Sequence, residues 1–140
     1  MMSDYAGDVS PKETWAALKN DPAAILIDVR TPAEWAYVGL PDVASLGKLV
    51  LTVAWQTWPE GQQNPAFLAE AREQGLKPGQ PVYLLCRSGV RSLAAAKALT
   101  EAGYGPCYNI AGGFEGPLDP TRHRGTLAGW KVEGLPWRQG

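Results

Sequence analysis

The sequence has little cysteine, almost no histidine and no excess charge of one sign. Its 140 residues include two cysteines and one histidine, too few for a disulfide scaffold and without the spacing of a zinc site. We therefore predict neither a metal nor another cofactor. The 13 lysines and arginines nearly balance 14 aspartates and glutamates, so no global field attracts nucleic acid or an acidic membrane as a partner.

Long hydrophobic runs are also missing. No stretch is long enough to cross a membrane, and the first residues lack the basic and apolar regions of a secretory signal. We therefore expect a cytoplasmic protein with reduced thiols. The length predicts a single domain over residues 1–140, with residues 1–9 as a flexible N-terminus.

Short apolar runs alternate with segments of helical character. Ser10-Pro11-Lys12-Glu13 and Thr31-Pro32-Ala33-Glu34 both have the form of a capping box, which starts a helix. Apolar, β-prone runs stand at 24–29, 82–85 and 107–110. This order predicts an α/β fold with a mainly parallel central sheet and helices on both faces. Segment 49–53 fits a strand or a helix, and 114–129 is expected to be a long loop.

The most informative stretch joins a strand to an alanine-rich helix through Cys86-Arg87-Ser88-Gly89-Val90-Arg91. Helix N-termini carry partial positive charge, and the two arginines add cationic charge, so these surroundings favour the thiolate of Cys86. Ser88 and Gly89 are small and let backbone N–H groups approach the sulfur. The pattern predicts a nucleophilic cysteine in an anion-binding loop.

Three motifs follow one another along the chain: Asp28-Val29-Arg30, the stretch from Cys86 to Ser92, and the pair Gly112-Gly113. Their order resembles that of the rhodanese (sulfurtransferase) domain. The resemblance spans about residues 10–137. It implies a rhodanese-like fold and a persulfide carried on Cys86. The residues that it implies for substrate binding are Arg87, Ser88, Gly89, Val90 and Arg91. Asp28 and Arg30 are expected to support the loop as a structural ion pair beneath it.

The resemblance also implies the partners of the reaction. A small sulfur-containing anion such as thiosulfate is the expected donor, and cyanide, a thiol or a protein is the expected acceptor. Two departures concern the rim of the site: the segment 39–44 lacks the histidine common in the family, and extra sequence stands at 44–64 and 114–129.

Two other functions stay open. Cysteine phosphatases and arsenate reductases also place a cysteine and an arginine at the two ends of a loop that precedes a helix. Here four residues separate Cys86 from Arg91, which makes a shorter loop than in those phosphatases. A catalytically silent rhodanese-like module would bind partners without chemistry, and such a module has no reason to keep the cysteine.

The remaining candidates have structural interpretations or border the site. Cys107, in an apolar run without cationic neighbours, is expected to be a buried hydrophobic residue. Glu34 is explained by its capping box, and His123 is expected to be exposed. In the extra segments, Trp55 and Trp58 are candidates for a hydrophobic wall, and a basic rim is predicted from Arg122, His123 and Arg124.

Overall fold

A five-stranded parallel sheet forms the centre of the molecule. The computed structural model describes residues 5–56 and 62–139. Every neighbouring pair of strands in this sheet is parallel. In spatial order the strands are β1 (Gly7–Val9), β6 (Cys107–Ile110), β5 (Val82–Leu85), β2 (Ile25–Asp28) and β4 (Leu51–Thr52).

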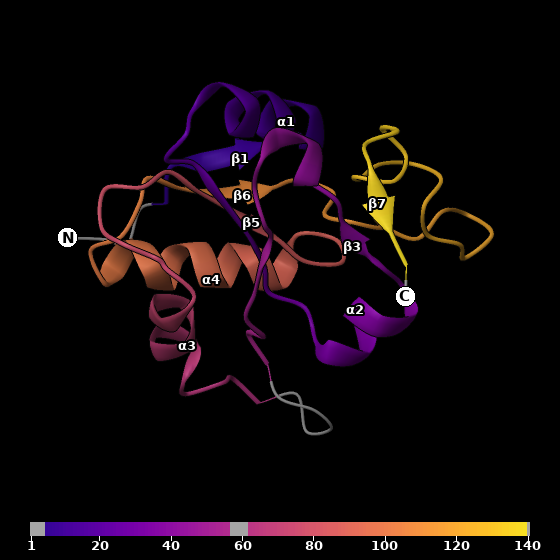
Figure 1. Cartoon of the computed structure of the whole chain (residues 1–140). Coiled ribbons are helices and arrows are strands. Elements are labelled where there is room, and N and C mark those ends of the chain that lie inside the picture. Colours follow the sequence, from indigo (N-terminus) through magenta and orange to yellow (C-terminus); the bar gives the residue numbers. More distant parts are fainter. Residues whose placement is uncertain (1–4, 57–61, 140) are drawn as a thin grey trace.

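Helices cover both faces of this sheet. Helix α1 (Pro11–Asn20) lies on one face, and α3 (Phe67–Glu73) and α4 (Val90–Glu101) lie on the other (Figure 1). The predicted α/β fold, with a mainly parallel sheet and helices on both faces, is confirmed. A short helix, α2 (Pro32–Tyr37), lies beside the main sheet, and a single 3₁₀ turn, η1, spans Ala44–Leu46.

Both predicted capping boxes are present. Ser10 accepts a hydrogen bond from the backbone N–H of Glu13 at the start of α1, and the Glu13 carboxylate accepts one from Ser10 N–H. Thr31 and Glu34 make the same reciprocal pair at the start of α2. These local signals fix where each helix begins.

Alternation along the strands sends side chains into two separate cores. Val82, Leu84 and Cys86 contribute to the core beneath α3 and α4, whereas Tyr83 and Leu85 contribute to the core beneath α1. This period of two follows from the pleat of a strand. The side chain of Cys86 therefore points to the face that α4 covers.

Three short strands were not predicted. β1 lies within residues 1–9, which were predicted to be a flexible N-terminus. Its residues Gly7–Val9 pair with β6, so the prediction is wrong for these three residues. Residues 1–4 lie outside the described residues. β3 (Leu40–Pro41) and β7 (Trp137–Arg138) pair antiparallel in a small second sheet. Strands of two or three residues show no detectable alternation, and their partners are far away in the sequence.

Two ambiguous segments now have a structure. Leu51–Thr52 form β4, so the strand interpretation of 49–53 is the correct one for these two residues. Residues 114–129 contain turns and bends and no helix or strand, as expected of a long loop. Within the described residues, the helices are all too short or too polar to span a membrane.

Candidate active site

The thiol of Cys86 lies at the carboxyl end of β5, directly under the start of α4. The residue is only 1% exposed. Helix α4 begins at Val90, one residue before the predicted end of the loop, and Gly89 is its N-cap at φ +112°. The Gly89 N–H donates to Cys86 Sγ at an N···S distance of 3.0 Å. Glycine is favoured at this positive φ, and in this backbone conformation the Gly89 N–H points toward the sulfur.

Ser92 supplies a second polar group next to the sulfur, which the sequence analysis missed. Its Oγ lies 3.2 Å from Cys86 Sγ and 2.5 Å from Asn109 Oδ1. Ser92 is completely buried in the first turn of α4. The sequence did contain a signal for this role, a serine directly after the loop on the apolar side of the helix. A buried hydroxyl there needs a hydrogen-bond partner.

Arg91 is held by Glu34, in a bidentate ion pair between α4 and α2. Arg91 Nη1 donates to Glu34 Oε1 at 2.6 Å, and Nη2 donates to Oε2 at 2.8 Å. Burial alone would raise the pKa of Glu34, but the hydrogen bonds and charge of Arg91, with smaller contributions from the Thr31 amide and Arg30, lower it to about 2. The hydrogen bonds from Glu34 in turn raise the pKa of Arg91. Glu34 therefore has a second role beyond capping α2.

The other loop residues differ in exposure. Arg87 is exposed, Ser88 and Gly89 are half-buried, and the Val90 side chain is 76% exposed. The loop therefore offers a cation and an apolar side chain to an incoming molecule, while the sulfur itself stays below the surface.

Asp28 and Arg30 form a buried ion pair at the end of β2. Arg30 Nη2 lies 2.6 Å from Asp28 Oδ2 and also donates to the carbonyl oxygen of Gly39 at 2.7 Å. The Arg30 guanidinium stacks on the Phe114 ring, 4.4 Å from its centroid. The pair ties β2 to the segment after α2 and to the loop after β6, which fits a supporting role.

The segment after β6 braces the cysteine loop from outside. Phe114 N–H donates to the carbonyl oxygen of Cys86 at 2.8 Å, and Glu115 N–H donates to that of Arg87 at 3.0 Å. At Gly113, with φ +60°, a methyl group would collide with the Cys86 carbonyl and lie 2.7 Å from that of Arg87. These contacts hold two loop carbonyls away from the sulfur.

The extra segments only partly match their predicted roles. Trp55 packs edge to face on Phe67, with 5.1 Å between ring centroids, and joins the core beneath α3 and α4 rather than a wall of the site. Trp58 lies outside the described residues. Arg124 donates to the carbonyl oxygen of Gly116 at 2.7 Å and so stabilises the loop.

Two further candidates lie as expected, with Cys107 in the core and His123 at the surface, whereas the basic rim stays a prediction. Arg122 and His123 are exposed, and the backbone N–H of His123 donates to Asp119. Cys107 is buried, and burial raises the pKa of its thiol. No cluster of three metal-ligating side chains occurs within residues 5–56 and 62–139.

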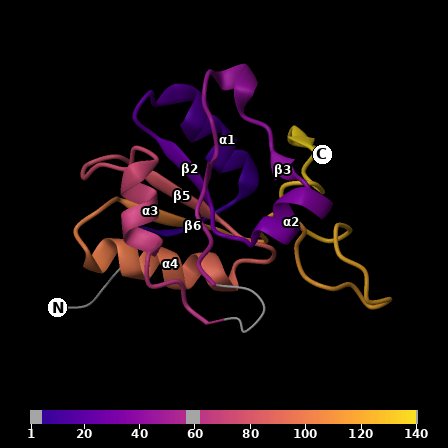
Figure 2. The same cartoon turned by 60° about the horizontal axis from the view of Figure 1, so that its bottom comes forward.

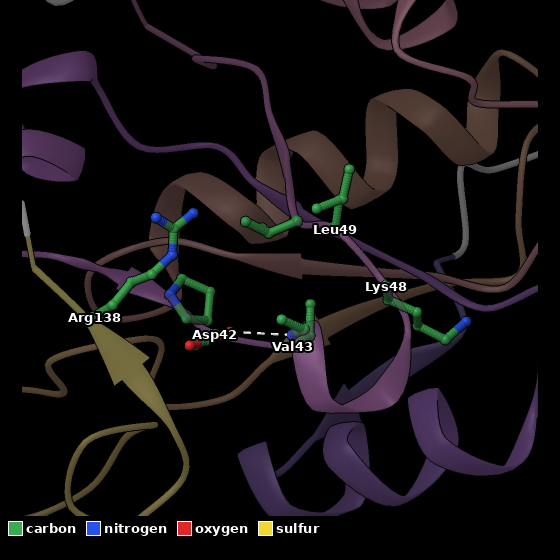
Figure 3. A pocket seen from close by; sticks show the side chains of 8 residues that line it. Asp42, Val43, Lys48, Leu49 and Arg138 are labelled. Atoms are coloured by element: carbon green, nitrogen blue, oxygen red, sulfur yellow. Dashed lines mark hydrogen bonds between the residues drawn. The ribbon is translucent and has the colours of Figure 1, made fainter.

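A pocket of about 190 Å³ lies elsewhere, between η1, β3 and β7 (Figure 3). Asp42, Val43, Leu49 and Arg138 are among its lining residues, and none belongs to the cysteine loop. Lys48, also in the lining, donates to three backbone carbonyls. By contrast, Figure 2 shows α2 and the 114–129 loop near the N-terminal end of α4, where the cysteine loop ends.

Comparisons with known proteins place this arrangement among sulfurtransferase relatives. A family model described as the STR4 middle domain matches residues 6–140. The crystal structure of Rv0390 from M. tuberculosis superposes with a TM-score of 0.89 and 51% sequence identity, over 98% of this chain and 100% of that one. The polysulfide-sulfur transferase homodimer from Wolinella succinogenes gives a TM-score of 0.65 and 27% identity, covering 95% of this chain and 78% of the other.

Curated sequences point the same way. An uncharacterized protein of Rickettsia conorii is 38% identical over 115 residues, which are 82% of this chain and 83% of that protein. The thiosulfate sulfurtransferase GlpE of Actinobacillus pleuropneumoniae is 27% identical over 135 residues, 96% of this chain and 95% of the relative.

Proposed function

Because this chain belongs to the rhodanese-like family, whose relatives include sulfurtransferases, we propose that it is a sulfurtransferase with Cys86 as the sulfur carrier. The observation that carries the proposal is the position of Cys86 Sγ, 3.0 Å from the Gly89 N–H at the start of α4. A helix start stabilises negative charge on a thiolate and on the persulfide that replaces it.

The reaction divides into two transfers of one sulfur atom. The Cys86 thiolate attacks the outer sulfur of a donor such as thiosulfate, the donor S–S bond breaks, and sulfite leaves with the electron pair. An acceptor nucleophile (cyanide, a thiol or a protein thiol) then attacks the outer sulfur of the persulfide, and the Cys86 thiolate leaves. Covalent catalysis of this kind gives ping-pong kinetics.

An oxyanion enzyme of the phosphatase type fits the site less well. Such chemistry needs the loop arginine to bind the equatorial oxygens of the substrate, whereas both terminal nitrogens of Arg91 are engaged by Glu34. A silent partner-binding module does not account for a thiol that is hydrogen-bonded at a helix start.

The test is formation of thiocyanate from thiosulfate and cyanide. We expect turnover with ping-pong kinetics for the unmodified chain, loss of at least a hundredfold in Cys86→Ser, and near-normal turnover in Cys107→Ser, because Cys107 is a buried core residue. Aryl phosphates should be hydrolysed negligibly in parallel assays. Turnover that survives in Cys86→Ser, or phosphatase activity comparable to sulfur transfer, contradicts the proposal.

A further inference from the structure

A row of hydrogen bonds connects the sulfur of Cys86 to an aspartate on the edge strand of the sheet. Ser92 Oγ lies between Cys86 Sγ, at 3.2 Å, and Asn109 Oδ1, at 2.5 Å. Asn109 Nδ2 donates to Asp8 Oδ1 at 3.0 Å. The side chains of Ser92 and Asn109 are buried, whereas Asp8, on β1, is exposed.

Asp8 decides which way the Asn109 amide faces. A carboxylate only accepts hydrogen bonds, so Asn109 turns its Nδ2 toward Asp8. The Tyr5 hydroxyl donates to the same Asp8 oxygen at 3.0 Å, which holds that oxygen in place. Asn109 Oδ1 therefore faces Ser92, and as an amide carbonyl it only accepts from the hydroxyl.

Ser92 has one hydroxyl proton and two neighbours that compete for it. When the proton goes to Asn109, the sulfur is left with a hydroxyl oxygen that only accepts. A thiol can donate its S–H to that oxygen. The inner sulfur of a persulfide has no formal charge, so it gains little from a hydrogen-bond donor. A thiolate, by contrast, gains most from a donor.

We propose that Asp8 and Asn109 are positioning residues that withhold the Ser92 proton from the Cys86 thiolate and so favour the thiol and persulfide forms. The inference rests on the proposed role of Cys86 as sulfur carrier. The thiolate is then stabilised mainly by the start of α4. Because it accepts one hydrogen bond fewer, it stays more nucleophilic. Neither residue touches the substrate in this account.

The charged groups around the sulfur must stay unchanged in a test. Arg91, paired with Glu34, comes from the first turn of α4, the helix that starts beside the sulfur. Arg87 belongs to the loop itself, and the Asp28–Arg30 pair lies at the end of β2. The variants proposed below leave all of these side chains in place.

The test compares Asp8→Ala with Asp8→Asn by measuring the rate of Cys86 alkylation by iodoacetamide against pH. Removing the side chain frees the Asn109 amide to turn and releases the Ser92 proton to the sulfur. The midpoint should move to lower pH by about one unit, the size expected for one hydrogen bond to a charged group. The amide of Asp8→Asn keeps a carbonyl oxygen for Tyr5 and Asn109, so its midpoint should stay in place. Asp8 is exposed on an edge strand, so both variants are expected to fold.

A Ser92→Ala background completes the experiment. There the shift caused by Asp8→Ala should vanish, because no hydroxyl proton remains to be released. Equal shifts in Asp8→Ala and Asp8→Asn that persist without Ser92 would show a purely electrostatic effect of Asp8 and overturn the inference, as would no shift at all. Alkylation needs no sulfur donor, so a protein that fails to form thiocyanate contradicts the proposed function and leaves this readout intact.

Discussion

Cys86, Arg91 and Ser92 come from one short stretch, and two of them, Arg91 and Ser92, have a partner from a distant part of the chain. Gly89 donates to the sulfur, Glu34 of α2 binds Arg91, and Asn109 of β6 accepts from Ser92. Sequence reasoning identified the cysteine and the two arginines of its loop, Arg87 and Arg91. It did not find Glu34 or Asn109 as partners, because these contacts depend on how distant elements pack.

The Glu34–Arg91 pair predicts a stability change in acid. The pKa of the Glu34 carboxyl is lowered from 4.5 to about 2 in the folded chain. The ion pair therefore contributes fully to the free energy of unfolding above pH 4.5. As the pH falls toward 2, the unfolded state takes up a proton before the folded state does, and this contribution is lost. The pair is partly exposed and screened by water, so we expect about 1–2 kcal/mol of unfolding free energy to be lost over this range.

Urea unfolding at several pH values measures this loss. In Glu34→Gln the acid-dependent part should be absent. The variant should therefore be less stable than the unmodified chain above pH 4.5, and the difference should narrow as the pH falls toward 2. Glu13→Gln is the matched control, because Glu13 has the same place in the capping box of α1. An unchanged pH dependence in Glu34→Gln contradicts the assignment.

At the level of elements, the strand, loop and helix that carry Cys86 could be predicted because their signals are local. A buried apolar run, small loop residues and an alanine-rich run lie next to one another in the sequence. β1, β3 and β7 could not be predicted, since a strand of two or three residues is defined by its pairing. For the same reason Asp8 was assigned to a flexible end, although it lies on β1.

Gly113 tests how the loop after β6 positions the cysteine loop. In Gly113→Ala the new methyl group presses on the carbonyls of Cys86 and Arg87, so we expect sulfur transfer to fall at least tenfold. Gly134→Ala is the control, since Gly134 also has a positive φ, +77°, with nothing within 4 Å of the added carbon. Both variants lose about 1 kcal/mol of stability to backbone strain.

Thiocyanate formation, together with thermal unfolding, separates the two effects. Similar unfolding temperatures with activity lost only in Gly113→Ala support the bracing role. Equal activity in the two glycine variants would show that the loop keeps its shape without this close contact.

At the scale of the whole molecule, segments before and after the cysteine loop, both far from it in the sequence, pack around one site. β1 brings Asp8 toward the sulfur from the first residues, and the segment after β6 brings Phe114 against the Cys86 carbonyl. The formal net charge of −1 provides no general attraction for an anion. Under the proposed function, recognition of a sulfur anion therefore relies on the local donors around Cys86.

The most direct test of the central claim is the mass of the intact protein before and after exposure to thiosulfate, followed by peptide mapping. We predict a gain of one sulfur atom, located on the peptide that contains Cys86 and removed by cyanide. The same treatment should leave Cys86→Ser unchanged in mass. No gain in the unmodified chain, or a sulfur atom found on Cys107 alone, would contradict the account.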